Sequence, residues 1–401
     1  MMKSKNIYLS LIALVLLIQA CVEEINIITE TEFESALVVE ATITNQVMQQ
    51  QVKLSRTYRL EEDGPSPENN AIIKVVSSTG QSYSFQEISN GLYGSINEFA
   101  AEQNVDYHLE ILTNDGRSYS SQDVNLTTPT QIDQVYVERD FNENEEEGVS
   151  VYVDTFDPTG SSKFYRFEYE ESYKIVAPLW IPEDVTYGIE DGMLVFPLVP
   201  RPIEELICFN TVISNSIDIT STNLLVEDRL EQYRVRFLNR NNYIISHRYS
   251  ILVKQYVQSQ AAYSYYEALS ELSESENILS ETQPGFLQGN MMSLSNSNEK
   301  VVGFFEVSSV DEKRIYFNYE DLFPGEPLPP YAQNCEQFFT PPTSDGGGGC
   351  PLCSFIEQGF KYFGPHEPTD PENEGPIVLV NRECGDCTAL GNSEPPDFWI
   401  D

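Results

Sequence analysis

The sequence predicts a mainly β protein, in which an N-terminal immunoglobulin-like β-sandwich precedes a larger β-rich domain with one main helix and a cysteine-stapled C-terminal cap. Three observations lead to this fold class. Apolar and polar residues alternate over most of the chain, turn-forming residues separate the alternating segments, and six of the seven cysteines follow residue 200. Because 40% of the residues are hydrophobic and 11% are aromatic, the chain can bury cores of ordinary size.

Residues 32–129 are predicted to form the β-sandwich domain, because about seven short strands in about 95 residues are typical of this architecture. Turn residues separate the strands at Gly64-Pro65, Thr79-Gly80, Asn90-Gly91 and Asn114-Asp115-Gly116, and the last of these favours a tight hairpin. The predicted strands are Ala36–Thr44, Gln51–Thr57, Ala71–Val76, Ser82–Phe85, Gly91–Ile96, Tyr107–Thr113 and Arg117–Val124.

A second, larger β-rich domain is predicted for residues 130–401, because Pro129 interrupts the alternation within residues 127–133. The acidic loop 142–147 offers oxygen ligands for calcium, but it lacks the Asp-x-Asp-x-Asp-Gly spacing, so we interpret it as a solvated loop. The predicted strands of this domain are Gln134–Arg139, Val149–Thr155, Lys163–Val176, Tyr233–Leu238, Tyr249–Val257, Val301–Val307 and Lys313–Tyr319.

One main helix is predicted at residues 258–273, where the hydrophobic period changes from two to about 3.6. Its predicted apolar face contains Ala261, Tyr265, Ala268, Leu269 and Leu272. The tyrosines of this segment are consistent with a ligand platform, but aromatic residues at helical spacing more often pack in a core. We therefore expect this face to be buried.

Six cysteines are candidates for disulfide bonds, and their connectivity is open because six cysteines allow 15 pairings. Cys350-Pro-Leu-Cys353 and Cys384-Gly-Asp-Cys387 also have the spacing of the two halves of a zinc ribbon. Export to an oxidising compartment favours disulfides over zinc, and a redox-active pair is a third alternative. The candidates are Cys208, Cys335, Cys350, Cys353, Cys384 and Cys387.

The Cys-rich cap is predicted at residues 335–401. It contains two segments that are poor in apolar residues and rich in Pro and Gly, at 340–349 and 365–376. Such loops do not bury enough apolar surface to hold a fixed structure, so we expect cross-links of about 2 to 4 kcal/mol each to hold them.

Residues 1–20 have the layout of a lipoprotein signal peptide. Lys3 and Lys5 precede an apolar run of 14 residues from Ile7 to Ala20, which as a helix of about 21 Å is shorter than the roughly 30 Å core of a bilayer. Ala20 then precedes Cys21, whose thiol we predict to be lipidated, with residues 21–31 as anchor and tether. An ordinary secretory signal is the alternative, and Gln19 is the imperfect element of the lipobox.

The charge of the chain narrows the class of partner. A formal net charge of −40 argues against binding nucleic acid and against lying flat on anionic lipid. Cationic cargo is slightly favoured by this charge, although solubility explains the charge equally well. Val22, Glu23 and Glu24 follow Cys21, and this acidic pair resembles the signal that sends Bacteroidota lipoproteins to the cell exterior. The alternative is that the pair is part of a generally acidic chain.

Catalytic motifs are not found in the sequence, and we predict a protein that is not an enzyme. His108, His247 and His366 are the histidines of the chain; none lies in His-Glu-x-x-His, and no Gly-x-Ser-x-Gly is present. We expect His108 to be a strand residue and His366 to be solvated. A carboxylate pair for glycoside hydrolysis stays open among 63 Asp and Glu residues, because its geometry depends on the fold.

The order of these motifs resembles domain-of-unknown-function family 4249, a family of Bacteroidota outer-membrane lipoproteins. The resemblance covers nearly the whole mature chain and implies no catalytic, cofactor or ligand residues. Members are commonly encoded beside TonB-dependent receptors, which implies such a β-barrel as a partner. The matching features are the lipobox at Cys21, the N-terminal strands, Ala261–Tyr266, Pro284–Asn290, Val302–Phe305 with Ser308-Ser309, Cys384–Cys387, Gly391-Asn392 and Pro396–Trp399.

The sequence and the resemblance together predict a lipid-anchored surface protein of the outer membrane, a non-catalytic accessory or binding subunit of a TonB-dependent receptor in nutrient uptake. The alternative is a structural or assembly lipoprotein of the outer envelope. No cofactor is expected, with zinc at the four cysteines of the two Cys-x-x-Cys pairs as the minor alternative.

Overall fold

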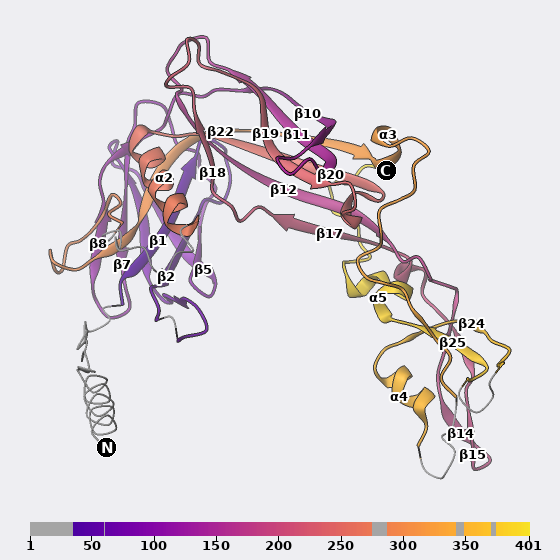
Figure 1. The fold of residues 1–401 in the computed structure, drawn as a ribbon. Coiled ribbons are helices and arrows are strands. Elements are labelled where there is room, and N and C mark those ends of the chain that lie inside the picture. Colours follow the sequence, from indigo (N-terminus) through magenta and orange to yellow (C-terminus); the bar gives the residue numbers. More distant parts are fainter. Residues whose placement is uncertain (1–34, 60, 275–286, 342–348, 370–373) are drawn as a thin grey trace, which may run out of the picture.

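A single long strand connects the two halves of the protein. The computed structural model describes residues 35–59, 61–274, 287–341, 349–369 and 374–401. In it, a β-sandwich, a central two-layered β unit and a disulfide-bonded cap follow one another along an elongated molecule (Figure 1). The predicted signal peptide, Cys21 and the tether to residue 31 lie outside the described residues. The structure confirms that the chain is mainly β, with disulfides near the C-terminus.

The N-terminal unit has two layers of strands that meet at β5 (Ser82–Ser89). The first half of β5 pairs with β4 and the second half pairs with β6, so that one strand turns from one layer into the other. The remaining strands of this unit are β1 (Leu37–Thr44), β2 (Gln51–Arg56), β3 (Ser66–Pro67), β4 (Ile72–Ser77), β6 (Leu92–Ser95), β7 (Asp106–Leu112), β8 (Ser118–Ser121) and β9 (Val124–Asn125).

The alternation of inward-facing and outward-facing residues along each strand explains the core of this unit. Leu37, Val39, Ala41 and Ile43 of β1 all point inward, each with 3% or less of its surface exposed. Two later segments complete the unit, namely β21 (Met291–Ser293), which pairs with β8, and the first half of β22 (Val301–Asn318), which pairs in parallel with β1. The N-terminal sandwich therefore includes strands that follow the predicted junction by more than 150 residues.

The central unit packs two further layers of strands. One layer continues the large sheet in the order β17, β12, β20 and β22, and the other is a three-stranded sheet in the order β10, β11 and β19. Val151, Phe167 and Val253 belong to the core between these layers. The strands are β10 (Ile132–Phe141), β11 (Glu147–Phe156), β12 (Phe164–Val176), β17 (Ile207–Ile213), β18 (Asp218–Ser221), β19 (Arg229–Asn239) and β20 (Arg248–Val257).

Strand β22 is one element of 18 residues, where the sequence predicted two separate strands. Residues 301–308 pair with β1, and residues 309–318 pair with β20. At about 3.3 Å per residue such a strand reaches about 60 Å. The polar residues 311–314 that suggested a break lie on the strand where it is partly exposed.

Helix α2 (Gln260–Glu274) confirms the predicted helix, although its buried face is rotated slightly from the expected one. Ala262 and Tyr265 are buried and pack with Phe304, whereas Ala261 is exposed. Tyr266 and Leu269 are partly buried beside them, at the i, i+3, i+4, i+7 spacing of one helical face. Shorter helices that the sequence did not predict are η1 (Ile203–Glu205), η2 (Tyr243–Ile245), α3 (Tyr319–Leu322), α4 (Pro351–Glu357), α5 (Arg382–Gly385) and η3 (Cys387–Ala389).

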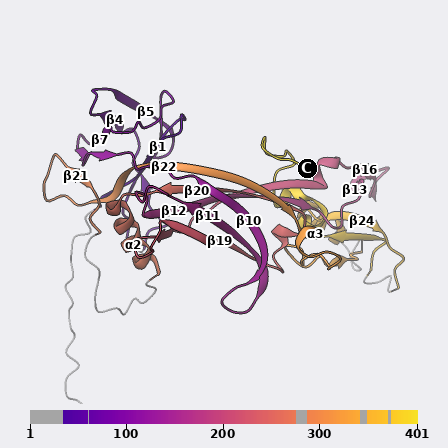
Figure 2. The same cartoon turned by 90° about the horizontal axis from the view of Figure 1, so that it is seen from above.

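The cap has its own small core, which contains Val185, Leu352, Tyr362 and Leu379. Viewed from above, the cap and the N-terminal sandwich lie at opposite ends of the central unit (Figure 2). Within the part of the chain that the structure describes, no helix is long and apolar enough to cross a membrane. The strands of the cap are β13 (Glu183–Val185), β14 (Gly188–Glu190), β15 (Met193–Val195), β16 (Leu198–Pro200), β23 (Gln337–Phe338), β24 (Lys361–Pro365) and β25 (Ile377–Val380).

Candidate functional site

The six candidate cysteines form three disulfides. Cys208 of β17 bonds to Cys387 across 179 residues, and Cys335 bonds to Cys384 across 49 residues. Cys350 bonds to Cys353 within one turn at the start of α4. The first disulfide ties the C-terminal end of the cap to β17 of the central unit, and the second ties it to the start of the cap after β22, which agrees with the predicted cross-linked cap.

The zinc-ribbon spacing does not produce a common metal site in this fold. A ribbon needs all four sulfurs at one point, but Cys384 and Cys387 bond to different partners and Cys350 and Cys353 bond to each other. The described residues contain no group of three or more His, Cys, Asp or Glu side chains that could hold a metal ion.

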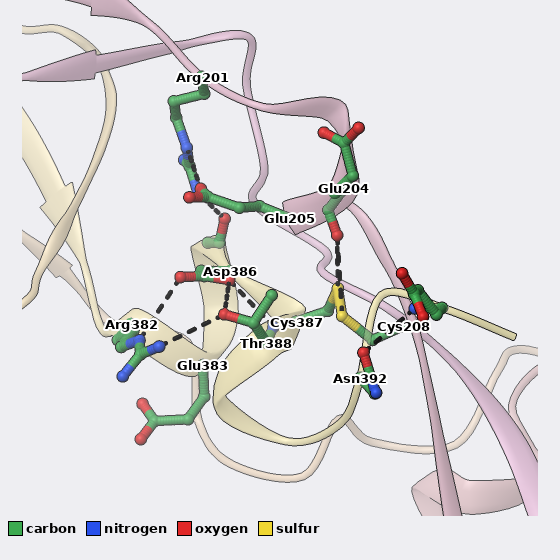
Figure 3. Close-up of a disulfide and its surroundings, with 12 residues drawn as sticks. Arg201, Glu204, Glu205, Cys208, Arg382, Glu383, Asp386, Cys387, Thr388 and Asn392 are labelled. Carbon is green, nitrogen blue, oxygen red and sulfur yellow. Dashed lines mark hydrogen bonds and ion pairs between the residues drawn. A yellow bond between two sulfur atoms is a disulfide. The ribbon is translucent and has the colours of Figure 1, made fainter.

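A network of ion pairs surrounds the Cys208–Cys387 disulfide (Figure 3). The Nε of Arg201 donates to Oε2 of Glu205 at 2.7 Å, and its guanidinium also donates to the carbonyl oxygen of Gly385. Lys361 Nζ lies 3.3 Å from Oδ2 of Asp386 and 3.4 Å from Oε2 of Glu205. The network therefore joins the segment before β17 to β24 and to the last turn of the cap.

Asp386 is buried within this network, and burial by itself raises the pKa of its carboxyl group. Hydrogen bonds from the side chain and backbone of Thr388, at 2.6 and 2.9 Å, together with Lys361, outweigh burial and lower the pKa. The charged form of Asp386 is thus the form that the cap stabilises. We conclude that this disulfide and these ion pairs hold the cap to the central unit.

A second candidate region is a cleft of about 650 Å³ beside helix α2. Its floor is the outer face of β1 and β2, and its walls are α2, β12 and the loop 214–217. Clefts of this size between structural units are common places for small ligands. The residues that line it include Thr42, Lys53, Arg166, Glu168, Ser214, Ser216, Tyr256, Tyr265, Tyr266, Leu269 and Phe304.

Arg166 is the central charge of this cleft. Its guanidinium contacts two aromatic rings, with Cζ at 4.2 Å from the ring centre of Tyr256 and 5.0 Å from that of Tyr266. It pairs with Glu168 and, at 3.2 Å, with the buried carboxylate of Glu306. The Nε atom of Arg166 is buried and has no partner among the described residues.

Electrostatics keeps Arg166 charged despite its burial. Burial by itself lowers the pKa of this side chain, but the attraction of Glu306 outweighs it and raises the pKa above the ordinary value. Burial raises the pKa of Tyr256 and of Tyr266, so both rings stay neutral. Arg166 with Glu168, and Lys53 with Glu40 at 2.9 Å, balance the charges that line the cleft. Such a lining suits an uncharged polar molecule more than an ion.

The helix tyrosines have two different roles. Tyr265 packs against Phe304 with ring centres 5.5 Å apart, which confirms the predicted core role. Tyr266 covers Arg166, and it therefore contributes to the cleft. No sequence signal marked Arg166, Glu168 or Glu306, because these residues are brought together only by pairing of β12, β20 and β22.

Several motifs that carried the family resemblance meet at the junction of the two units. The side chain of Asn290 mimics a strand by donating to the carbonyl oxygen of Phe305 and accepting from its backbone nitrogen, each at 2.8 Å. Gly303 has φ +129°, and a Cβ there would lie 2.0 Å from the carbonyl oxygen of Val39. Only glycine fits this position, because its neighbour strand approaches so closely. Residues 284–286 of the first motif lie outside the described residues.

The C-terminal Pro396–Trp399 motif packs on the central sheet. The ring of Phe398 lies 3.5 Å from Cζ of Arg314, and the ring of Trp399 lies 4.9 Å from that of Phe209. The hydroxyl of Tyr316 donates to the carbonyl oxygen of Phe398. The end of the chain is thereby fixed near the Cys208–Cys387 disulfide.

The remaining sequence candidates are dispersed over the molecule. His108 is a strand residue, as predicted, and its Nδ1 lies 3.1 Å from Asp123. His366 was expected to be solvated, but it is partly buried against Phe339, with Nε2 3.2 Å from Glu374. Burial, followed by the charge of Lys174, lowers the pKa of His247. The three histidines lie on different elements and do not converge.

The acidic loop after β10 is a turn held by Asn142. The side-chain oxygen of Asn142 accepts hydrogen bonds from the backbone nitrogens of Asn144 and Glu146, both at 2.9 Å. Glu147 pairs with Arg139 and Arg240. Residues 143–146 are exposed, as predicted for a solvated loop.

Comparisons with known proteins give one clear relationship. A search of curated proteins finds no match. The crystal structure of a DUF4785 family protein from Legionella pneumophila matches with a TM-score of 0.18 and 11% identity, over 54% of this chain and 51% of that chain. The chain thus spans about half the length of that protein, and a likeness at this level carries no argument about fold or function. Residues 22–314 match the model of the domain of unknown function DUF4249, and the chain therefore belongs to the DUF4249 family.

Proposed function

We propose that this protein is a lipid-anchored protein of the outer-membrane surface, a non-catalytic accessory or binding subunit of a TonB-dependent receptor in nutrient uptake. The lipidated residue is Cys21, and Glu23 and Glu24 direct the chain to the cell exterior. The signal-like segment, the acidic pair and the resemblance to receptor-associated Bacteroidota lipoproteins support this proposal.

The observation that carries the proposal is the linear arrangement of the molecule. Leu37, the first residue of β1, pairs with Val301, the first residue of β22, and β22 then runs away from this point toward the central unit. A chain anchored before residue 35 would hold the sandwich next to the membrane anchor and present the cap at the other end. This arrangement suits a rigid spacer that carries a binding surface to a partner.

Co-purification tests the receptor partnership. Affinity-tagged protein expressed at its native level is crosslinked in intact cells and recovered from detergent-solubilised outer membranes. We expect a large β-barrel protein to be recovered with it. A Cys21→Ser variant is the matched control, because serine has no thiol to carry the lipid, and it should recover much less of the barrel. Repeated recovery of the tagged chain without any barrel would contradict the proposal.

The cleft beside α2 is the proposed place of cargo binding, because it combines aromatic, hydroxyl and balanced charged groups in one concave site. A Thr42→Trp variant fills the cleft from its floor, and Lys74→Trp is the control on an outward-facing position of β4. We expect Thr42→Trp to reproduce the growth defect of a deletion strain on one nutrient, with no effect of Lys74→Trp. A broadly weakened envelope in the deletion strain would instead indicate a structural or assembly lipoprotein.

A further inference from the structure

The cap carries a hairpin arm that extends beyond its own hydrophobic core. The arm consists of residues 183–200, in which β13 pairs with β16 and β14 pairs with β15 in one uninterrupted register. In both views the arm lies at the end of the molecule opposite the N-terminal sandwich (Figures 1 and 2). A two-stranded hairpin has little independent stability in water, so an extended one needs support.

One face of this arm is apolar from the Val185–Leu198 pair to the Ile189–Leu194 pair. The register places Val185 opposite Leu198 and Ile189 opposite Leu194, and it places Tyr187 opposite Phe196 between them. Val185 is 3% exposed and Phe196 is partly buried, because the core of the cap covers the base of the arm. The core of the cap does not cover Leu198 opposite Val185, and toward the tip it covers neither strand.

The uncovered part of the face is unusually apolar for a surface. Ile189 is 77% exposed, Leu198 is 45% exposed, Tyr187 is 40% exposed and Leu194 is 36% exposed. A contiguous group of exposed large apolar side chains on one face is typical of a surface that binds another molecule. Two hydrogen bonds hold the arm to the cap. The backbone nitrogen of Tyr362 donates to Oδ1 of Asp184 at 3.1 Å, and the hydroxyl of Tyr187 donates to Glu357.

The charged side chains around this apolar face indicate which kind of molecule can bind to it. Glu183, Glu190 and Asp191 are exposed, and residues 183–200 contain no Lys, Arg or His. Anionic lipid would be repelled by these carboxylates, and a second copy of the chain would bring the same carboxylates and a further net charge of −40. A protein surface with an apolar centre and a rim of Lys or Arg side chains satisfies both the apolar face and the acidic edge.

We infer that the hairpin arm 183–200 is the surface by which this protein docks on its protein partner, through an apolar patch with a basic rim. This inference rests on the proposed function, in which the partner is the β-barrel receptor. The apolar face forms the buried centre of the interface. The carboxylates at the tip pair with the basic rim of the partner and so determine how the arm is oriented on it.

The experiment compares the two faces of the same hairpin in the co-purification described above. The test variant is Ile189→Ser with Leu194→Ser, on the apolar face. The control is Met193→Ser, which is 67% exposed and lies opposite Glu190 on the other face. All three substitutions are at exposed positions, so melting temperatures should stay close to that of the unmodified chain. We expect the test variant to recover at least tenfold less barrel, and the control to stay within twofold.

Each other outcome overturns the assignment in a different way. If the unmodified chain recovers the barrel and the test variant recovers it equally, the arm is not the docking surface, although the receptor partnership holds. If the unmodified chain recovers no barrel, the proposed function fails first. Binding of the soluble chain to phosphatidylethanolamine–phosphatidylglycerol vesicles that the test variant loses would identify lipid as the occupant, and loss of a dimer in sedimentation would identify a second copy.

Discussion

At the scale of single residues, the structure contains side chains and glycines whose roles depend on one close contact. Gly303 permits β1 and β22 to approach, Asn290 replaces a missing strand neighbour, and Arg166 neutralises Glu306 inside the protein. Each of these roles requires a specific atom in a specific place. Substitutions at such positions should therefore have effects out of proportion to their size.

Gly303→Ala should destabilise the protein by about 2 to 6 kcal/mol, because an added Cβ would both overlap Val39 and impose an unfavourable φ of +129°. Gly80→Ala is the control, since Gly80 also has a positive φ of +87° but has nothing within 4 Å of the added carbon. We expect a cost of about 1 kcal/mol there. Urea denaturation measures both values, and equal costs at the two positions would show that the contact with Val39 is unimportant.

Asp218→Asn should stabilise the protein at pH 7.5 by about 1 to 2 kcal/mol. Burial raises the pKa of Asp218 from 3.8 to about 6, against the hydrogen bond that Tyr233 donates. The folded protein therefore binds this proton more tightly than the unfolded chain does, so stability falls as pH rises from about 4 to about 6. The penalty is complete above pH 6. The gain is limited to this range because Asp218 is partly exposed and solvent screens its charge.

The matched control for this change is Asp63→Asn, which removes the same charge at an exposed position. Thermal unfolding from pH 4 to pH 8 should show that the stabilisation by Asp218→Asn grows between pH 4 and pH 6 and is constant above. A gain of the same size at pH 4 would show that the effect does not come from ionisation of Asp218.

At the scale of elements, the three disulfides differ in the length of chain that they close. Cys208–Cys387 closes a loop of 179 residues, Cys335–Cys384 one of 49, and Cys350–Cys353 one of 3. In the chain-entropy model a longer closed loop removes more freedom from the unfolded chain, which corresponds to about 5, 4 and 2 kcal/mol. The three disulfides thus contribute unequally to the free energy of unfolding.

Paired replacement of cysteines by alanine should lower stability in that order. Cys208→Ala with Cys387→Ala should have the largest effect, and Cys350→Ala with Cys353→Ala the smallest. Differential scanning calorimetry under non-reducing conditions measures the melting temperatures, and the unmodified protein in dithiothreitol provides the fully reduced reference. A larger loss for the Cys350–Cys353 pair than for the Cys208–Cys387 pair would contradict the loop-length argument.

Most individual elements were predictable because their causes are local. The period-two pattern of β1 and the Asn114-Asp115-Gly116 turn between β7 and β8 act over a few residues. The two long-range disulfides, the continuity of β22 and the pairing of Arg166 with Glu306 were not predictable, because each depends on residues more than 45 positions apart. The sequence did not predict the hairpin arm, because Pro and Gly residues interrupt its alternation of apolar and polar residues and are more typical of loops.

At the scale of the whole molecule, the N-terminal sandwich and the central unit share β22 and one large sheet. Met291, Phe305 and Val307 belong to the core of the sandwich, although they follow the helix in sequence. The sandwich is consequently incomplete without residues that come after the central unit. Its folding should therefore depend on a distant part of the chain.

A fragment of residues 32–129 should lack a cooperative unfolding transition, because it lacks β21 and the strand that covers one edge of β1. A second fragment, in which residues 287–310 are joined to the first by a flexible linker, should recover the transition. Circular dichroism during urea denaturation distinguishes the two. Cooperative unfolding of the shorter fragment would show that residues 32–129 fold as a unit.

The parallel pairing of β1 with β22 also determines how the protein responds to a pull. Tension between the N-terminal end of the chain and the cap would draw β1 from its first residue and β22 from its last, in opposite directions along the strands. All hydrogen bonds between residues 37–44 and 301–308 would then bear the load together in shear, and none would be opened singly as in a zipper. A pull of this direction would therefore meet the combined resistance of the whole β1–β22 ladder, whereas a pull across the strands would break its hydrogen bonds one at a time.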